Sequence, residues 1–229
     1  MFVDGIGDLF RLYCDEDDET FLAAAQVTSA LTVGYDQFRR QIVQTDPYSY
    51  AARVSISPTS DFYDLADAAN PTRILGASLA PAGTRRLYQL LKVVNVDTAG
   101  AVNWYYRGAG SFEEMDRLSQ RYILSGTVLR FSEDQSGETV RIEYVPVSAV
   151  DWTQLTAGDN EFVDDFDAFH DLIALYAYKQ YSIRDGAPNP ELDGQLKRRE
   201  LELELYLSAG RVPEMSDHIL DERRVSGWR

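Results

Sequence analysis

The sequence predicts an α+β protein in which an antiparallel helical bundle, made of an N-terminal helix and a C-terminal helical hairpin, carries an inserted β-rich lobe and an extended C-terminal tail. Apolar residues recur at helical spacing near the N-terminus, short strand-like segments fill the middle, and two helical segments joined by a Gly-Pro turn follow. We expect four parts: residues 1–49 as the N-terminal helical part of the bundle, 50–150 as the inserted β-rich lobe, 151–209 as an acidic linker and the helical hairpin, and 210–229 as the tail.

The first helical segment is expected between about residues 17 and 46. Acidic residues at its start suit a helix N-terminus, and Pro47 ends it. Apolar residues recur at steps of three and four, which predicts a single apolar stripe along the helix. Gly34 and the Thr and Val residues around it have low helix propensity, so we expect a kink or break near the middle.

The region from about residue 50 to 148 is rich in short segments with strand character. They alternate or run apolar between turn signals, as in ARVSIS, VNWYYRG and TVRIEYVPV. The segment EDQSGET, at 133–139, is interpreted as a hairpin loop between two strands. Ser111 with Glu114 three residues later matches a capping box, so a helical turn is expected at 111–119.

A helical hairpin is expected between residues 164 and 209. The apolar face of its first helix, over 164–183, is so wide that burial on most sides is predicted. Glycine and proline in RDGAPNP then end that helix. The second helix is expected from Pro190 to Ala209, because its Leu, Glu, Lys and Arg residues are strong helix formers, although LELELYL also alternates as a strand would. The short turn predicts an antiparallel pair.

The acidic residues are concentrated in two segments of the chain. The sequence has 22 basic and 37 acidic residues, a net charge of −15, to which residues 1–20 contribute −6 and residues 151–171 contribute −7. Proteins that bind nucleic acid tightly need clustered basic residues, since these displace counterions from the phosphates. No run of Lys and Arg occurs, so strong binding of DNA or RNA is not expected. The acids serve either to keep the protein soluble or to repel DNA.

Compartment and membrane association are predicted from three features of the sequence. No window of eighteen or more consecutive apolar residues occurs, so no spanning helix is expected. The first residues lack a basic region followed by a long apolar run, so no secretory signal is expected. Cys14 is the single cysteine, which suits a reducing compartment. We therefore expect synthesis in the cytoplasm.

The sequence signatures of catalysis, cofactors and metals are largely missing, so neither an enzyme nor a cofactor-binding or metal-binding protein is expected. A GxxxxGK[ST] loop is absent, and Gly108 and Gly110 lack the third glycine of a dinucleotide fingerprint. Asp167 and His170 share a helix face, but one such pair offers too few ligands for structural zinc, which favours a capping or salt-bridging role. Cys14 has no nearby histidine, and no GxSxG motif occurs.

The order of these regions resembles that of a known family. The strand RIEYVPV, the acidic linker, the helix FHDLIALYAYKQYSIRDG and the charged helix that follows form the most specific part of the pattern, over 138–207. This arrangement is similar to the head-to-tail adaptor, or connector, proteins of tailed bacteriophages. The N-terminal helix and the β-rich lobe agree with that family in order only, and the lobe is larger than the minimal helical adaptors need.

The resemblance implies a structural virion protein at the head-tail junction and not an enzyme. Such a protein forms a twelvefold ring beneath the portal, extends the DNA channel and offers a surface to a tail or neck protein, while DNA passes through without specific binding. The wide apolar face and the tyrosines of the hairpin suit neighbours in a ring. We expect the subunit interface at Tyr176, Tyr178, Tyr181 and Tyr206, channel-lining acids at Asp159, Glu161, Asp164 and Asp165, and portal-binding tail residues at Ile219, Leu220, Arg223, Arg224 and Trp228.

Two alternative functions remain open at this point. The first is another virion part, such as a tail-completion protein, which has the same kind of composition. The second is a carbohydrate-binding β module that stacks sugars on the aromatic residues of NWYYRG, at 103–108. Half-buried strand residues are the preferred interpretation of that segment.

Overall fold

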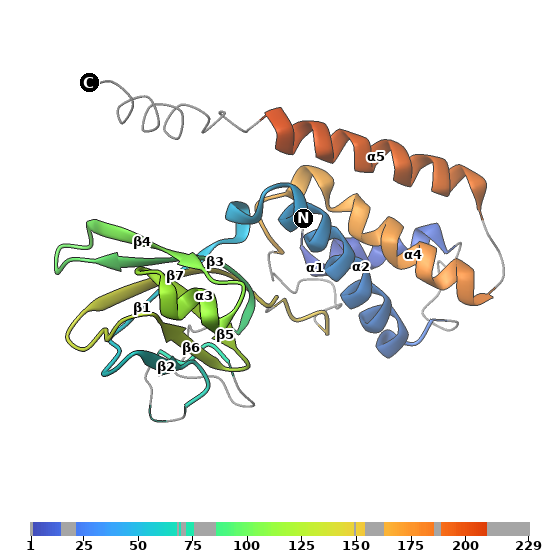
Figure 1. The fold of residues 1–229 in the computed structure, drawn as a ribbon. Coiled ribbons are helices and arrows are strands. Elements are labelled where there is room, and N and C mark those ends of the chain that lie inside the picture. Colours follow the sequence, from blue (N-terminus) through green and yellow to red (C-terminus); the bar gives the residue numbers. More distant parts are fainter. Residues whose placement is uncertain are drawn as a thin grey trace, which may run out of the picture. The chain divides into compact units, whose positions relative to one another are not determined.

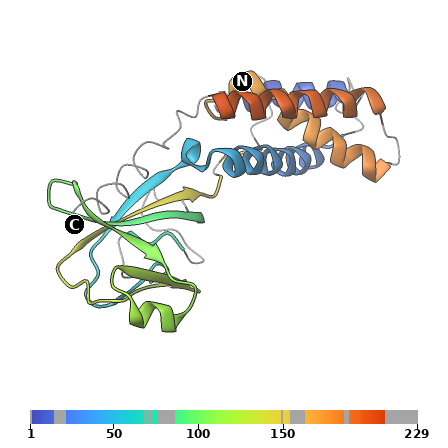
Figure 2. The ribbon, with the colours of Figure 1, turned by 45° about the horizontal axis from the view of Figure 1, so that its top comes forward.

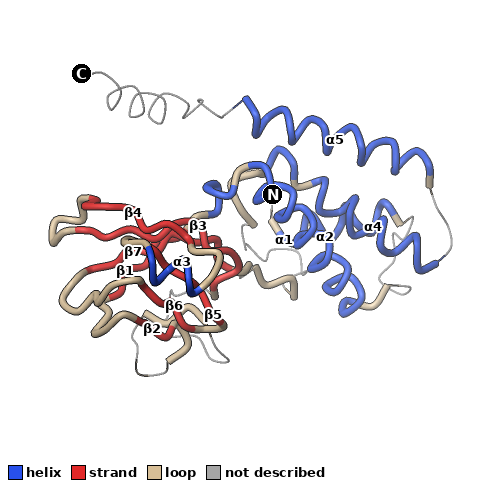
Figure 3. Tube along the Cα trace, viewed as in Figure 1, coloured by secondary structure: helices blue, strands red, loops and turns tan. Residues whose placement is uncertain are grey.

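The protein consists of two compact units, which we call the helical unit and the sheet unit (Figure 1). The computed structural model describes residues 2–14, 22–67, 69, 72–75, 86–148, 150–153, 163–185 and 189–209. The helical unit comprises Met1–Asp46 and Val150–Arg229, and the sheet unit comprises Pro47–Ala149. The division is plain in Figure 3, where most helices belong to the first unit and all labelled strands to the second.

The helical unit is built around one central helix. Its elements are α1 (Val3–Tyr13), α2 (Ala24–Thr45), a 3-10 turn (Asp167–Phe169), α4 (Asp171–Asp185) and α5 (Pro190–Ala209). Helix α4 contacts α1, α2 and α5. Residues 172–178 of α4 are therefore buried without interruption. This confirms that the apolar face of α4 covers most of its circumference.

The N-terminal region forms two helices and not the single helix expected over 17–46. Helix α1 buries Val3, Ile6 and Phe10, which share one face at steps of three and four. Helix α2 begins at Ala24 and continues past Gly34 to Thr45, so the expected break is absent. Packing against α4 outweighs the low helix propensity of glycine at that position.

The sheet unit is one mixed sheet of seven strands. They are β1 (Ala52–Ile56), β2 (Phe62–Asp64), β3 (Leu87–Val96), β4 (Val102–Gly108), β5 (Arg121–Ser125), β6 (Val128–Phe131) and β7 (Thr139–Pro146), with a 3-10 turn (Pro47–Tyr50) before β1. Their order is β1-β7-β3-β4-β5-β6-β2, and only β4 and β5 pair in parallel among these neighbours. Inward side chains from distant strands, such as Val93, Leu129 and Ile142, form its core.

The expected architecture, a helical bundle that carries an inserted β-rich lobe, is wrong. The β-rich part is no appendage, because its seven strands form a continuous sheet with a separate hydrophobic core. Strand alternation indicated that strands exist in this region. It did not show that β1, from the start of the region, pairs with β7 at its end, with Val54 opposite Ile142. That long-range pairing is what makes a large, self-contained sheet.

The loop 133–139 is not the hairpin loop that the sequence indicated. Strand β6 pairs with β5 and β2, whereas β7 pairs with β1 and β3, so the loop crosses between separate parts of the sheet. The tight hairpins lie elsewhere, between β3 and β4 and between β5 and β6, where Gly100 and Gly126 adopt positive φ.

The helical turn expected at 111–119 is confirmed as α3 (Phe112–Arg117). The Ser111 hydroxyl oxygen accepts a hydrogen bond from the Glu114 backbone N–H at 3.2 Å. Glu114 reaches back to accept from the Gly110 N–H at 2.9 Å. Both contacts satisfy backbone donors that a helix start leaves open.

Candidate interaction site

The guanidinium of Arg199 connects the two C-terminal helices, α4 and α5, through hydrogen bonds. Its Nε and Nη2 donate to the two carboxylate oxygens of Asp171, at 2.7 and 2.6 Å, and Nη2 also donates to the Ala168 carbonyl. Hydrogen bonds to Asp171 raise the pKa of Arg199 above its ordinary value. The group also lies 5.1 Å from the centre of the Phe169 ring. Arg199 therefore fixes α5 (Pro190–Ala209) against the start of α4.

Tyr176 lies inside the helical unit and offers no surface to a neighbouring subunit. Its side chain is fully buried. Its hydroxyl donates to Glu200 at 2.8 Å, and Gln41 lies 3.4 Å away on the other side. Burial, and then the carboxylate of Glu200, raise the pKa of Tyr176 far above its ordinary value. Tyr176 therefore does not belong to a subunit interface, because its buried ring and its hydroxyl both contact residues of its own chain.

The other three tyrosines of the expected interface differ in exposure. Tyr178 is 9% exposed. Tyr181 is half-buried, and its ring and that of Phe10 pack nearly perpendicular to each other, with centroids 6.2 Å apart. Tyr206 is 58% exposed, and one side of its ring packs on Phe169 at 5.3 Å. Tyr206 is thus the tyrosine of this set with the most surface available to a partner.

The expected channel-lining acids also differ in exposure. Asp164 binds within its own unit: it accepts from the Tyr35 hydroxyl at 3.0 Å and lies 2.7 Å from Nε2 of His170. Its side chain is 9% exposed, so it is poorly placed to face a channel. Asp165 is exposed. Asp159 and Glu161 lie outside the described residues, as do the expected portal-binding residues Ile219, Leu220, Arg223, Arg224 and Trp228.

His170 was expected to pair with Asp167, and in the structure it instead lies beside Asp164. The ring of His170 is fully buried and also contacts Phe38 edge-on, at 6.2 Å between centroids. Asp164, His170 and Tyr35 together join the segment before α4 to α2. This arrangement supports a structural role. No group of three or more His, Cys, Asp or Glu side chains suited to a metal ion occurs among the residues that the structure describes.

The net charge is segregated between the two units. Counted over the unit boundaries, the helical unit has 12 basic and 26 acidic residues, a net charge of −14, whereas the sheet unit has 10 basic and 11 acidic residues, a net charge of −1. Exposed acids of the helical unit include Asp8, Asp165 and Asp167. Its surface therefore carries a negative potential that repels other anions.

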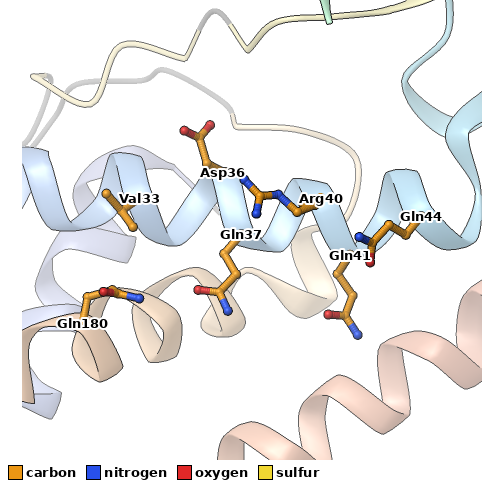
Figure 4. Close-up of a pocket in the computed structure, with 7 residues that line it drawn as sticks. All are labelled: Val33, Asp36, Gln37, Arg40, Gln41, Gln44 and Gln180. Atoms are coloured by element: carbon orange, nitrogen blue, oxygen red, sulfur yellow. The ribbon is translucent and has the colours of Figure 1, made fainter. Parts of the chain in front are cut away.

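A polar groove runs along α2 and was not anticipated from the sequence. Its volume is about 480 Å³, and Figure 4 shows the side chains that line it: Val33, Asp36, Gln37, Arg40, Gln41 and Gln44 from α2, with Gln180 from α4. The α2 residues recur at steps of three and four, which was the signal available in the sequence. Amide side chains both donate and accept hydrogen bonds, so the groove is suited to a polar partner segment.

The aromatic segment of β4 is mainly a structural part of the sheet. Tyr106 is buried in the core, and its hydroxyl donates to Gln135. Trp104 is partly buried, packs against the same core and meets Tyr106 edge-on. Tyr105 points to the other side, where the ammonium of Lys92 lies 4.4 Å from its ring centre. A flat aromatic platform for sugar stacking receives little support from this arrangement.

The chain matches no protein-family model. Nor does it match any curated protein at a significant level. Among the helices that the structure describes, none has both the length and the apolar composition needed to cross a lipid bilayer.

Proposed function

We propose that this chain is a head-to-tail adaptor of a tailed-bacteriophage virion. In this role it forms a ring of about twelve copies, as the resemblance implies, binds the portal, extends the DNA channel and provides the attachment surface for the tail. The observation that carries the proposal is the segregation of charge, with a net −14 in the helical unit against −1 in the sheet unit.

The acidic helical unit suits a passage through which DNA slides. Exposed carboxylates repel phosphates within a screening distance of roughly 8–10 Å at physiological salt. A ring repeats each carboxylate around its axis, so the repulsion is directed inward from all sides and keeps the duplex centred. Asp165 is the member of the expected channel-lining set that is described and exposed.

The order of elements also supports the proposal. Helix α2 precedes the sheet, β7 contains the RIEYVPV strand, and α4 and α5 follow an acidic linker, which is the order on which the resemblance is based. A cyclic ring needs two different surfaces on each copy. The exposed ring of Tyr206 on α5 and the glutamine-lined groove on α2 are two such surfaces of the helical unit.

Binding to portal rings tests the proposal. The portal protein encoded in the same genome is purified as a ring and mixed with the full-length chain, and the complex is analysed by sedimentation and electron microscopy. We expect co-sedimentation and a ring of about twelve copies on one end of the portal. If the chain does not bind portal rings but binds the end of a tail tube, it is a tail-completion protein, and the proposal is contradicted.

The tail residues are tested in the same assay. Replacement of Trp228 by Ala together with Arg223→Ala and Arg224→Ala should abolish co-sedimentation, since Trp and Arg dominate binding energy at protein interfaces. His218→Ala, in the same segment but outside the expected set, should leave binding unchanged. If deletion of 211–229 leaves portal binding intact, these residues are not the anchor.

A further inference from the structure

Helix α5 has a second, outward-facing apolar surface that its own unit does not cover. Its inward side buries Leu196, Leu203 and Leu207. On the opposite side Leu201 and Leu205 are 56% and 61% exposed. Figure 2 shows α5 along the edge of the helical unit, next to α4. The pair, one helical turn apart, forms an apolar surface, and a partner helix that covers it removes that surface from water.

The residues that share a face with this pair have the spacing of a coiled-coil seam, with the two leucines as its apolar side chains. Along the outward side they alternate at steps of three and four, over more than two heptads, and we call this set the outer stripe: Glu191, Gly194, Arg198, Leu201, Leu205 and Ser208. Steps of three and four place side chains on a single narrow line of a helix. A Cβ atom added at Gly194 would meet no atom within 4 Å, so the stripe is open to solvent there.

We propose that the outer stripe binds the outer stripe of a second copy of this chain, with the two α5 helices antiparallel about a twofold axis. In the register that aligns the two stripes, Gly194 lies opposite the partner subunit's Leu205, and Arg198 lies opposite the partner subunit's Leu201. The missing side chain of Gly194 leaves room for a leucine. The methylene groups of Arg198 cover the other leucine, while its guanidinium stays in water.

The charges that flank the stripe favour this register. Lys197 and Glu204 are both exposed and lie on the same edge of the stripe. In the antiparallel pair Lys197 faces the partner subunit's Glu204, and the twofold axis repeats the contact, which gives two ion pairs. A parallel pair would instead set Gly194 against glycine and Arg198 against arginine, which leaves a gap and a repulsion. Charge and shape thus both select the antiparallel form.

This association is separate from the ring of the proposed function and does not rest on it. A twofold contact uses the same surface on both copies and closes after two of them, whereas a ring needs two different surfaces. We expect the pair in the free protein, before any larger assembly.

Sedimentation velocity of the full-length chain tests the pairing. From about 1 to 200 μM the protein should pass from monomer to dimer, because a seam with two leucines per helix supports only moderate affinity. Lys197→Glu should weaken the dimer about tenfold, since it replaces two attractive pairs by two repulsive ones. The double variant Lys197→Glu with Glu204→Lys should restore the affinity of the native chain to within about threefold, because it exchanges the two charges. Leu201→Glu should abolish the dimer.

Matched controls keep folding and charge apart from pairing. Arg117→Glu, a similar reversal at an exposed position of the sheet unit, should leave dimerisation unchanged, and circular dichroism should show every variant folded. A monomer over the whole range overturns the proposal, as does a dimer that Lys197→Glu does not weaken or that the double variant does not restore. The proposal is also overturned if a truncated chain of residues 1–209 dimerises while the full-length chain stays monomeric. In that case residues 210–229 would cover the outer stripe in the full-length chain.

Discussion

Gly34 of α2 lies directly against the backbone of Ile173 in α4. A Cβ atom at position 34 would overlap the Ile173 carbonyl oxygen, and it would lie 2.9 Å from the backbone nitrogen of Ala177. The two helices therefore approach each other through backbone, without a side chain between them. Glycine at this position is required by the close packing of α2 on the central helix, and the helix continues through it.

Gly34→Ala should destabilise the helical unit by about 3 kcal/mol, because backbone atoms of α4 cannot give way as a flexible side chain can. Urea denaturation, followed by circular dichroism, measures the loss. Gly194→Ala is the matched control: it changes the same residue type on a helix where the added Cβ meets nothing. In dilute protein it should stabilise by about 0.5–1 kcal/mol through helix propensity. Equal effects of the two substitutions would contradict this account.

Arg199→Lys should loosen α5 from α4 by about 2 kcal/mol, since an ammonium cannot make the two parallel hydrogen bonds that the guanidinium makes to Asp171. Amide hydrogen exchange should show faster exchange in α5 than in the native chain. In protein dilute enough to be monomeric, Arg198→Lys, at the neighbouring exposed position, serves as the control and should leave the exchange rates unchanged. Unchanged exchange in Arg199→Lys would show that the paired contact contributes little.

Alkaline pH should destabilise the protein through Tyr176. Its pKa is raised in the folded chain, by burial first and by Glu200 second, so the folded state holds a proton that the unfolded state loses above about pH 10. Stability from this group is fully present below pH 10. Above it, each pH unit removes about 1.4 kcal/mol.

Tyr176→Phe removes this dependence on pH. Although the variant loses the hydrogen bond to Glu200, the gap in unfolding free energy between it and the native chain should narrow steadily above about pH 10. Denaturation series at several alkaline pH values measure the gap. Glu200→Gln should keep most of the dependence, because burial is the larger cause. A gap that stays constant between neutral and alkaline pH would contradict the assignment.

Tyr106→Phe should destabilise the sheet unit by about 1–2 kcal/mol, because it leaves the buried amide of Gln135 without the hydroxyl that donates to it. Gln135 belongs to the loop that leads into β7, so the pairing of that strand should weaken as well. Tyr105→Phe, at the adjacent exposed position of the same strand, should change stability by less than about 0.5 kcal/mol. Thermal unfolding of the two variants gives the comparison.

The features that were predicted correctly depend on neighbours along the chain. The bounds of α5, Pro190–Ala209, agree with the prediction, because strong helix formers and the preceding proline act locally. The cap of α3 by Ser111 is local in the same sense. Helix α1 was missed, since its three buried apolar residues span too few turns to stand out. Asp164 and Tyr176 were assigned to surfaces because their partners, such as Tyr35 and Glu200, lie far away in the sequence.

By itself the sequence determined the helical character of α2, α4 and α5, the extended character of β1, β4 and β7, the breadth of the apolar face on α4 and the concentration of acidic residues. Each of these depends on composition or on spacing within one segment. The strand order, the crossing of the loop 133–139 and the internal use of Asp164 and Tyr176 were decided only by the tertiary structure. The physical reason is that an alternating pattern indicates that a strand has a buried face. Which neighbouring strand or helix covers that face is selected by packing over the whole chain.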